Sequence, residues 1–376
     1  MYSRDDFKEE LQRLKTLERL RRLEPRKAEG VYLIEKNGNR LCNFGSNDYL
    51  GFAVRTPAVS RQGAGASALV SGWTDQHQDL ADQLAIFEST EAACLFPTGY
   101  AACSGVVSTL AGENDIIFSD ALNHASLIDG CRLSKAKCLV YPHRDMATLR
   151  QILHENRSQY RNAWIVTDGG FSMDGHLAPL EQICDLRDEF DLGVIVDEAH
   201  ATGVLGKQGK GVAELLGVKQ RVDVVIGTLS KGIGSHGGFV ASNSETIDYL
   251  INHCRTLIYS TALPPNSVAA ASDSLRRVQS NTIERERVTS FAQFIRQELG
   301  ITVGSHETGI PIIPLIVGED HKAVSVSNSL HESGFYVPAI RPPTVPSGTA
   351  RLRISVTALH SQEMVEQLLS HLRHLL

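Results

Sequence analysis

One lysine of this sequence stands where a reactive amine could do covalent chemistry. An apolar run at 224–226 leads to Lys231, and a glycine-rich turn follows it. Upstream, a second apolar run ends at Asp197, with His200 shortly after it. A lysine amine bonds an aldehyde as a Schiff base, and a carboxylate can keep a pyridine nitrogen protonated. A lysine and an acid at two strand ends therefore point to pyridoxal phosphate as the cofactor.

Other polar residues follow predicted strands in the same way. Asp168 and Thr228 fall just past strand ends, as Asp197 does, and ligands of parallel sheets bind at the carboxyl ends of strands. His124 and His200 lie in polar turns after strands, which favours a functional role over a core or surface role. No HxH or HxxxH spacing accompanies them, so metal ligation is not expected. We therefore predict one shared site without a metal.

The turn at 97–101, which includes Gly99 and Tyr100, joins a predicted strand to a helix of small residues. The N-terminus of such a helix could capture a phosphate, since its free N–H groups and its dipole favour anions. An ordinary strand–helix turn would look the same, so both interpretations stay open. The arginines at 19–26 are a similar case: they could bind a substrate carboxylate, but a solvated helix end is favoured.

Two short motifs suggest other functions but lack the context those functions need. Residues 197–200 spell DEAH, the box of nucleic-acid helicases, yet no phosphate loop of the form GxxxxGKS or GxxxxGKT is present. Residues 232–237 match GxGxxG, but a strand-like run follows at once and leaves no room for the helix that a dinucleotide fingerprint must open. We interpret these glycines as a tight turn after Lys231.

From about residue 76, the apolar pattern alternates between helices and strands. Such alternation predicts an α/β fold with a mostly parallel sheet and helices on both faces. The carboxyl ends of the strands would then carry the polar residues described above. The expected strands are 93–96, 116–118, 138–141, 163–167, 193–196, 222–227 and 238–241, and the expected helices are 77–88, 100–111, 125–134, 145–155 and 179–190.

The two ends of the chain show different patterns. An amphipathic helix is expected at 5–23, then short strands at 31–34 and 41–44, then a loop-rich stretch at 45–72. We expect three parts: an N-terminal helix with short strands (1–50), a large α/β domain (51–262) and a smaller α+β domain (263–376). The last part should contain helices at 266–299, 321–333 and from 361, and strands at 312–317 and 351–356.

Composition limits the possible partners. The chain has 376 residues, 42% hydrophobic and 21% charged, which suits a large folded core. Its net charge is −6 and it has no long basic run, so neither nucleic acid nor an anionic membrane is an expected partner. The first residues are charged and lack a signal-peptide core. Seven cysteines without a CxxC pair suggest neither zinc nor a redox motif, and we expect a cytoplasmic protein.

Three longer segments together resemble the α-oxoamine synthases. They are 228–232 (TLSKG), 196–203 (VDEAHATG) and 43–51 (NFGSNDYLG), and segments 171–175 and 258–261 extend the resemblance. These enzymes are pyridoxal-phosphate acyltransferases of fold type I, which join an amino acid to an acyl-CoA with loss of carbon dioxide. The resemblance covers the chain from about residue 10 to its end, and it implies this transferase fold and a homodimer with active sites at the interface.

The resemblance also implies a role for each matching residue. Lys231 would bond the cofactor and later move the Cα proton, Asp197 would pair with the pyridine nitrogen, and His200 would contact the phenolic oxygen. His124 would stack over the ring, and it is counted with the catalytic, cofactor and substrate residues. The other expected cofactor residues are Gly99, Tyr100, Ser172, Thr228 and, reaching the neighbouring subunit's phosphate, Ser260 and Thr261; the other expected substrate residues are Arg21, Asn47, Thr344 and Arg353, the last for the amino-acid carboxylate.

The substrate prediction depends on segment 340–353. It is similar to the C-terminal signature of those family members that condense L-alanine with a pimeloyl thioester, carried by CoA or an acyl carrier protein, in biotin biosynthesis. The alternatives are a sibling such as a glycine C-acetyltransferase and a cofactor-free scaffold, although an intact lysine, acid and histidine set speaks against the scaffold. The sequence departs from the family at 52–72, which looks shortened, and at Asp168, where relatives often carry glutamate. Both departures bear on acyl-chain selectivity.

Overall fold

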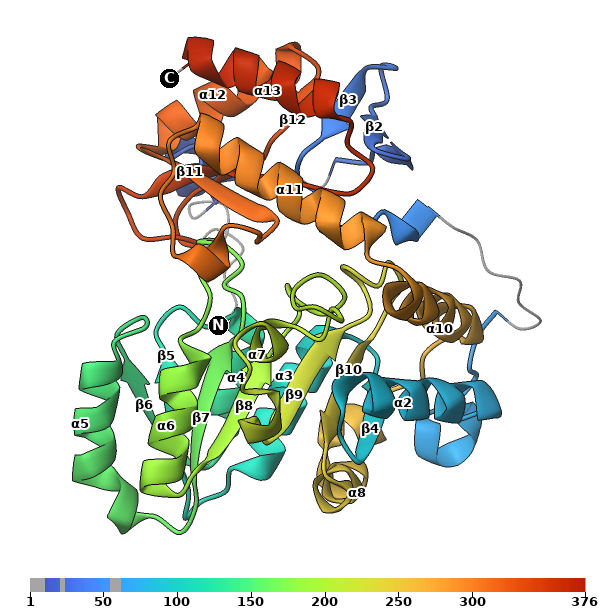
Figure 1. Cartoon of the computed structure of the whole chain (residues 1–376), viewed down its shortest axis with the longest axis vertical. Helices are drawn as coiled ribbons and strands as arrows, with labels where there is room; N and C mark the ends of the chain where they lie inside the picture. The colour runs from blue at the N-terminus through green and yellow to red at the C-terminus, as the bar shows by residue number, and fades with distance from the viewer. Residues whose placement is uncertain (1–10, 21–23, 55–61, 376) are drawn as a thin grey trace.

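A computed structural model describes residues 11–20, 24–54 and 62–375 of the chain. Its largest sheet has seven strands in the order β4-β10-β9-β8-β7-β5-β6 (Figure 1). Strand β10 runs antiparallel to both of its neighbours, and the pairs among β9, β8, β7, β5 and β6 are parallel. The predicted, mostly parallel sheet is therefore confirmed. Its strands are β4 (Ala92–Phe96), β5 (Ile116–Asp120), β6 (Lys137–Tyr141), β7 (Ala163–Asp168), β8 (Gly193–Asp197), β9 (Val224–Thr228) and β10 (Gly238–Ser242).

Helices cover both faces of this sheet because its strands are apolar on both sides. In β8, Val194 and Val196 belong to one buried cluster, whereas Ile195, which points the opposite way, belongs to another. The first cluster includes side chains of α2 (Asp75–Glu88), α5 (Met146–Asn156), α6 (Leu180–Phe190) and α10 (Pro265–Ser280). The second includes side chains of α3 (Gly99–Leu110), α4 (Ala125–Leu133), α8 (Ser244–His253) and α9 (Arg255–Ile258).

The C-terminal segment builds a smaller sheet with helices beside it, in the upper part of Figure 1. Its strands are ordered β11-β14-β13. A third sheet, β1-β2-β3-β12, joins the N-terminal strands to this segment. The elements are β11 (Ile312–Gly318), β13 (Ala339–Ile340), β14 (Ala350–Ser355), α11 (Ile283–Glu298), α12 (Asp320–Glu332), α13 (Gln362–Leu375), β1 (Lys27–Glu29), β2 (Tyr32–Ile34), β3 (Arg40–Asn43) and β12 (Phe335–Tyr336).

The structure differs from the sequence predictions at several boundaries. The helix expected at 5–23 is helical over 11–16 among its described residues, and it ends where Glu18 takes a φ of 54°. Arg19 then forms an ion pair with Asp320 at 2.8 Å, a distant contact that no local pattern reveals. The helical stretch expected at 266–299 consists of α10 and α11, with Asn281 in an extended conformation between them. The loop-rich stretch also contains two short helical turns, at Phe52–Val54 and Ala68–Gly72, and α7 (Val212–Leu215) was not predicted.

All seven cysteines are free thiols, in line with the absence of a CxxC motif. Among the described residues, no helix is long and apolar enough to cross a membrane. Within these described residues, no three or more His, Cys, Asp or Glu side chains lie together in a way that could hold a metal ion. The division into parts at residues 50 and 262 stays a prediction.

His360 should make the stability of the fold depend on pH. Its ring stacks on Phe44 with centroids 4.0 Å apart, Nδ1 accepts from the Thr357 N–H, and Nε2 donates to the Asn43 carbonyl. Burial lowers the pKa of His360 from 6.5 to about 4. The unfolded chain therefore binds a proton between these pH values and the native chain does not, so stability is full above pH 6.5 and falls toward pH 4. The loss should reach about 2 kcal/mol at pH 5.

Urea unfolding at pH 7 and pH 5 measures this loss. His360→Phe keeps an aromatic ring beside Phe44 but cannot titrate, so its stability should change less between the two pH values. An equal pH dependence in the wild type and His360→Phe would contradict the assignment to His360.

Candidate active site

The carboxyl ends of four neighbouring strands bring the predicted polar residues together. Asp168 and Asp197 are register partners at the ends of β7 and β8, and Thr228 ends β9. His124 follows β5 and caps the N-terminus of α4. The two acids and Thr228 are buried, with exposed fractions of 4–5%. This arrangement is the switch region where ligands of open α/β sheets bind.

The Lys231 amine lies inside this region. The chain turns tightly after it, with the Gly234 N–H donating to the Lys231 carbonyl at 2.9 Å. Gly234 has a φ of +67°, and a Cβ there would lie 2.6 Å from the Ala53 nitrogen, so this turn requires glycine. The predicted tight turn is confirmed. Burial lowers the pKa of Lys231 below 10.5, although Asp197 and Asp168 oppose that shift. A larger share of neutral amine suits attack on an aldehyde.

A chain of hydrogen bonds links Lys231 to Arg353. Lys231 Nζ lies 2.8 Å from His200 Nε2, and His200 Nδ1 lies 2.7 Å from the Tyr49 hydroxyl. The Tyr49 hydroxyl donates to Asn47 Oδ1 at 3.1 Å, and Arg353 Nη1 donates to the same oxygen at 3.1 Å. Tyr49 therefore accepts from His200 Nδ1–H, which leaves Nε2 free to accept from Lys231. Burial lowers the pKa of His200 well below 6.5, so its ring is neutral.

Sequence reasoning missed Tyr49, although it lies in segment 43–51, which carries the family resemblance. Tyr49→Phe should lower turnover about tenfold, because it leaves the buried Nδ1–H of His200 without an acceptor, at a cost of about 1–3 kcal/mol. The pH profile of turnover should shift as well, since His200 loses the contact that sets its tautomer. Steady-state rates from pH 6 to 9 measure both effects.

Tyr141→Phe is the matched control for this substitution. Tyr141 is also fully buried, but its hydroxyl has no hydrogen-bond partner among the described residues. Turnover and pH profile should stay close to wild type in this variant. If Tyr49→Phe behaves like Tyr141→Phe, Tyr49 does not position His200.

Asp197 and Asp168 place a buried negative charge beside the lysine. Asp197 Oδ1 accepts from the Ala199 N–H at 2.9 Å, and Oδ2 accepts from the Cys103 thiol at 3.1 Å. Asp168 Oδ2 accepts from the His124 N–H at 2.7 Å. Burial first, and then the neighbouring Asp197, raise the pKa of Asp168 well above 3.8. The pair therefore favours one negative charge rather than two, and Cys103 is a contact that sequence reasoning did not identify.

His124 is held in a fixed position above this pair. Its Nδ1 lies 2.7 Å from the Ser126 hydroxyl, and its ring meets that of Tyr100 edge-on, with centroids 6.2 Å apart. Burial lowers the pKa of His124 below 6.5, so the ring is neutral and can stack on a flat ligand. Asp168 orders the histidine through its backbone N–H, which explains why the acid belongs to the site.

The N-terminus of α3 can hold an anion. The Thr98 hydroxyl accepts from the Ala101 N–H at 3.0 Å, and the N–H groups of Gly99 and Tyr100 have no acceptor among the described residues. A Cβ on Gly99 would lie 3.2 Å from Thr228, so a glycine leaves room there. The Thr228 hydroxyl lies 2.8 Å from that of Ser230. Free N–H groups at the start of a twelve-residue helix, beside hydroxyls, suit a phosphate.

These residues fit pyridoxal phosphate. A neutral buried amine suits its aldehyde, a buried carboxylate suits its ring nitrogen, and the α3 N-terminus suits its phosphate. The fit rests on the Lys231 amine, the Asp197 carboxylate, and the free N–H groups of Gly99 and Tyr100.

Arg353 reaches the site from the smaller sheet, β11-β14-β13. It lies on β14, is 5% exposed, and its Nε donates to the Ser172 carbonyl at 2.6 Å. Its Nη1 donates to Asn47 and, at 2.8 Å, to the Ser355 hydroxyl. Nη2 has no acceptor among the described residues, so two N–H donors remain for a substrate carboxylate.

Two predicted site residues, Ser260 and Thr261, take part in none of the hydrogen bonds of this cluster. Thr261 pairs with Ser67 in an isolated β-bridge and is exposed, and Ser260 precedes it. Thr344 is exposed in a turn where its N–H donates to the Arg341 carbonyl at 3.1 Å. Arg21 lies outside the described residues.

The chain belongs to the aminotransferase class I and II family, whose sequence pattern matches residues 39–372. It is 42% identical to the 8-amino-7-oxononanoate synthase of Lysinibacillus sphaericus, over 98% of this chain and 97% of that protein. It is 47% identical to the putative 8-amino-7-oxononanoate synthase of Bacillus licheniformis, over 93% of this chain and 94% of that one. Among solved structures, a serine palmitoyltransferase from S. paucimobilis with bound pyridoxal phosphate and myriocin superposes with a TM-score of 0.90. The two sequences are 28% identical, and the superposition covers 99% of this chain and 96% of the palmitoyltransferase chain. The predicted fold type is confirmed.

Proposed function

We propose that this chain catalyses the 8-amino-7-oxononanoate synthase reaction. L-alanine and a pimeloyl thioester combine to give the amino-oxo acid, and carbon dioxide and the thiol leave. The observation that carries the proposal is the hydrogen-bond chain that links Lys231 to Arg353 of the smaller sheet. It runs through His200, Tyr49 and Asn47, and the buried Asp197 lies beside Lys231 at the end of β8. The relatives named for this reaction match over nearly the whole chain, which supports the choice of substrates.

The chain is a pyridoxal-phosphate enzyme. The bound cofactor supplies an aldehyde carbon for an amine and a protonated ring that takes up the electron pair left at Cα. Asp197 keeps the ring nitrogen protonated, and the α3 N-terminus, with Gly99, Tyr100 and Thr228, holds the phosphate.

The remaining residues orient the amino acid and move protons. The free Nη2 donors of Arg353 grip the carboxylate of L-alanine, and His124 stacks against the ring. With the cofactor bound, Lys231 would take the Cα proton of L-alanine, while His200 and Tyr49 would hold its Nζ in position. Ser172 lines the ring near the Arg353 contact.

The acyl donor and the neighbouring subunit complete the proposal. Arg21 binds the far carboxylate of the pimeloyl chain, since a bidentate guanidinium suits a terminal carboxylate, and Thr344 contacts the substrate. The enzyme acts as a homodimer, in which Ser260 and Thr261 reach the phosphate of the other subunit. Thr261 is exposed and Ser260 half-buried, and Thr261 pairs with Ser67 outside the Lys231 cluster, which supports this role.

A substrate panel tests the proposed function. L-alanine, glycine and L-serine are each combined with pimeloyl-, acetyl- and palmitoyl-CoA, and product and carbon dioxide are measured. We expect pimeloyl-CoA with L-alanine to give the highest kcat/KM. Selectivity among amino acids should be modest, because one methyl group provides only about 1–3 kcal/mol. A strong preference for acetyl- or palmitoyl-CoA would replace this reaction with that of a sibling synthase.

A further inference from the structure

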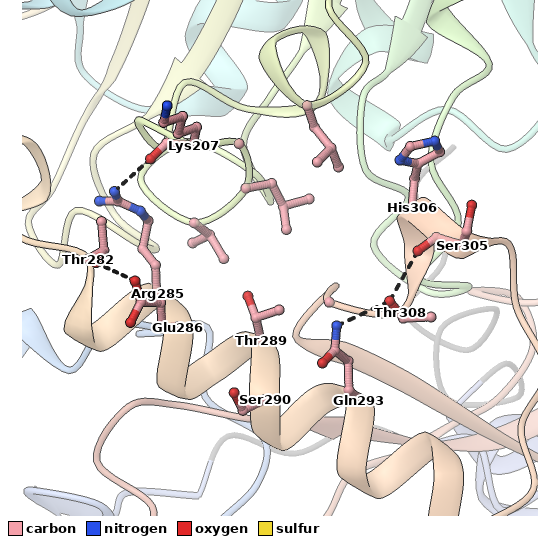
Figure 2. A pocket seen from close by; sticks show the side chains of 15 residues that line it. Lys207, Thr282, Arg285, Glu286, Thr289, Ser290, Gln293, Ser305, His306 and Thr308 are labelled. Carbon is pink, nitrogen blue, oxygen red and sulfur yellow. Dashed lines mark hydrogen bonds between the residues drawn. The ribbon is translucent and has the colours of Figure 1, made fainter.

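A second cavity lies apart from the Lys231 site, between α11 and the segment that follows β8 (Figure 2). Its volume is about 610 Å³, within the range of small-molecule sites. None of the residues proposed above for the cofactor or L-alanine lines it. Its walls are the apolar Val204, Leu205 and Leu215, the polar face of α11, and the segment 305–309.

Helix α11 turns a polar stripe toward this cavity. Residues spaced three and four apart share one face of a helix. The lining residues of α11 have this spacing, and its core face lies elsewhere, with Val288 and Ile295 fully buried. Figure 2 shows hydroxyl and amide groups of this stripe along one wall. The labelled members are Thr289, Ser290 and Gln293, with Arg285 and Glu286 one turn earlier.

Arg285 is a buried cation whose guanidinium contacts carbonyl groups. Burial lowers its pKa below 12.5, and the nearby carboxylates of Glu214, Glu286 and Glu284 oppose that shift. Arg285 is 7% exposed, and its guanidinium donates to the carbonyls of Val278, Asn281 and Lys207 at 2.5, 3.2 and 3.1 Å. Three of its five N–H donors are thus used, and no carboxylate of the described residues forms an ion pair with it. Two N–H donors of this buried guanidinium stay unused, so a ligand whose oxygens accept from them would be stabilised here.

Arg187 of this chain shows how a guanidinium binds a carboxylate through two parallel hydrogen bonds. Arg187 grips the Asp223 carboxylate with Nε at 2.9 Å and Nη2 at 2.6 Å. Nε and one Nη2 donor of Arg285 are not used in this way. An anion with two adjacent oxygens would complete the same fork.

A second positive charge lies at the same end of the cavity. Figure 2 places Lys207 beside Arg285, and the exposed Lys207 ammonium has no ion-pair partner among the described residues. An adjacent cavity of about 470 Å³ shares Lys207 and Arg285 and adds Lys210. The Glu286 carboxylate also lines this end, but the cations Arg285, Lys207 and Lys210 outnumber it and suit a phosphate better than a neutral group.

We propose that this cavity binds a nucleoside monophosphate. Its phosphate lies on Arg285 and Lys207, its sugar hydroxyls meet the Thr289 and Gln293 side chains, and its base lies against Val204. The cavity has a cationic end, a wall of hydroxyl and amide groups, and an apolar wall. These three surfaces match the phosphate, the sugar and the base of such a ligand.

The ligand would also bear on the catalytic lysine. Val204 lines the cavity on one side and packs against Gly232, the residue after Lys231, on the other. A Cβ on Gly232 would lie 2.9 Å from Val204 Cγ2, which shows how closely the two segments pack. A ligand seated on Val204 therefore restricts the turn that carries Lys231, and the cavity is a regulatory site.

Calorimetric titration of the holoenzyme with adenosine 5′-monophosphate tests the proposal. We expect saturable binding to the wild type and to the control Lys135→Glu, which reverses an exposed lysine elsewhere on the surface. Lys207→Glu, which removes a cation, and Ser290→Trp, which fills the cavity, should each weaken binding at least about tenfold. Adenosine without phosphate should bind at least about tenfold more weakly than the monophosphate.

The visible band of the bound cofactor reports the link to Lys231 without any substrate. Adenosine 5′-monophosphate should change this band in the wild type and not in Ser290→Trp, whether or not the proposed substrates are correct. An absence of saturable binding, or equal binding to all variants, would overturn the site. Displacement of the nucleotide by pimeloyl-CoA in competition would also overturn it, because the probe would then report the acyl-donor site. An unchanged band on saturation would overturn the regulatory role.

Discussion

Replacing Lys231 with alanine should abolish turnover. The substitution removes the amine that bonds the cofactor and moves the Cα proton, so the rate should fall at least about a thousandfold, or about 4 kcal/mol of barrier. The protein should still fold, because Lys231 lies in a turn whose shape depends on Gly234 and not on the lysine side chain. Product formation from L-alanine and pimeloyl-CoA measures the loss.

Lys135→Ala is the control for this substitution, since Lys135 is exposed and lies outside the site. It should retain wild-type turnover. Circular dichroism and the melting temperature establish that Lys231→Ala is folded. A folded Lys231→Ala variant with more than about a tenth of wild-type turnover would remove Lys231 from the mechanism, since that loss corresponds to only about 1.4 kcal/mol.

Asp197→Asn should have the second largest effect. The amide has nearly the shape of the carboxylate and can still accept from the Ala199 N–H, so folding should be preserved. It carries no charge, however, and cannot keep the pyridine nitrogen protonated. Turnover should fall by about two to four orders of magnitude, each tenfold corresponding to about 1.4 kcal/mol.

Asp168→Asn is the comparison for Asp197→Asn. Because burial and Asp197 raise the pKa of Asp168, its carboxyl is the one of the pair that can be neutral. A neutral amide there should cost much less turnover than at Asp197. If the two variants lose equal activity, or if Asp197→Asn stays near wild type, the charge that supports the cofactor does not reside on Asp197.

The parts of this fold that repeat a strong local pattern could be predicted from the sequence. The buried strands β7, β8 and β9 are apolar runs that end in Asp168, Asp197 and Thr228, so both the sheet and the location of the site follow from composition and position. The turn after Lys231 was predictable because a strand-like run follows its glycines at once and leaves no room for a helix. The short strands β1, β12 and β13 do not show a period and were missed.

The site residues that could not be identified from the sequence depend on contacts between distant segments. Tyr49 and His200 are far apart in sequence and meet only because the N-terminal segment folds back over the β8 end. Cys103 reaches Asp197 from α3 in the same way. A buried aromatic or thiol carries no local signal that separates a site residue from a core residue. Arg285 was also not identified, because its burial and its contacts with carbonyl groups are visible only in three dimensions.

Borohydride reduction followed by peptide mapping tests the central claim most directly. The purified protein should be yellow with a visible band, and reduction should abolish the band and fix the cofactor to one lysine. We predict that the peptide containing Lys231, and no other, carries the added mass. A cofactor fixed to any other lysine would contradict the assignment of Lys231 and the site built around it.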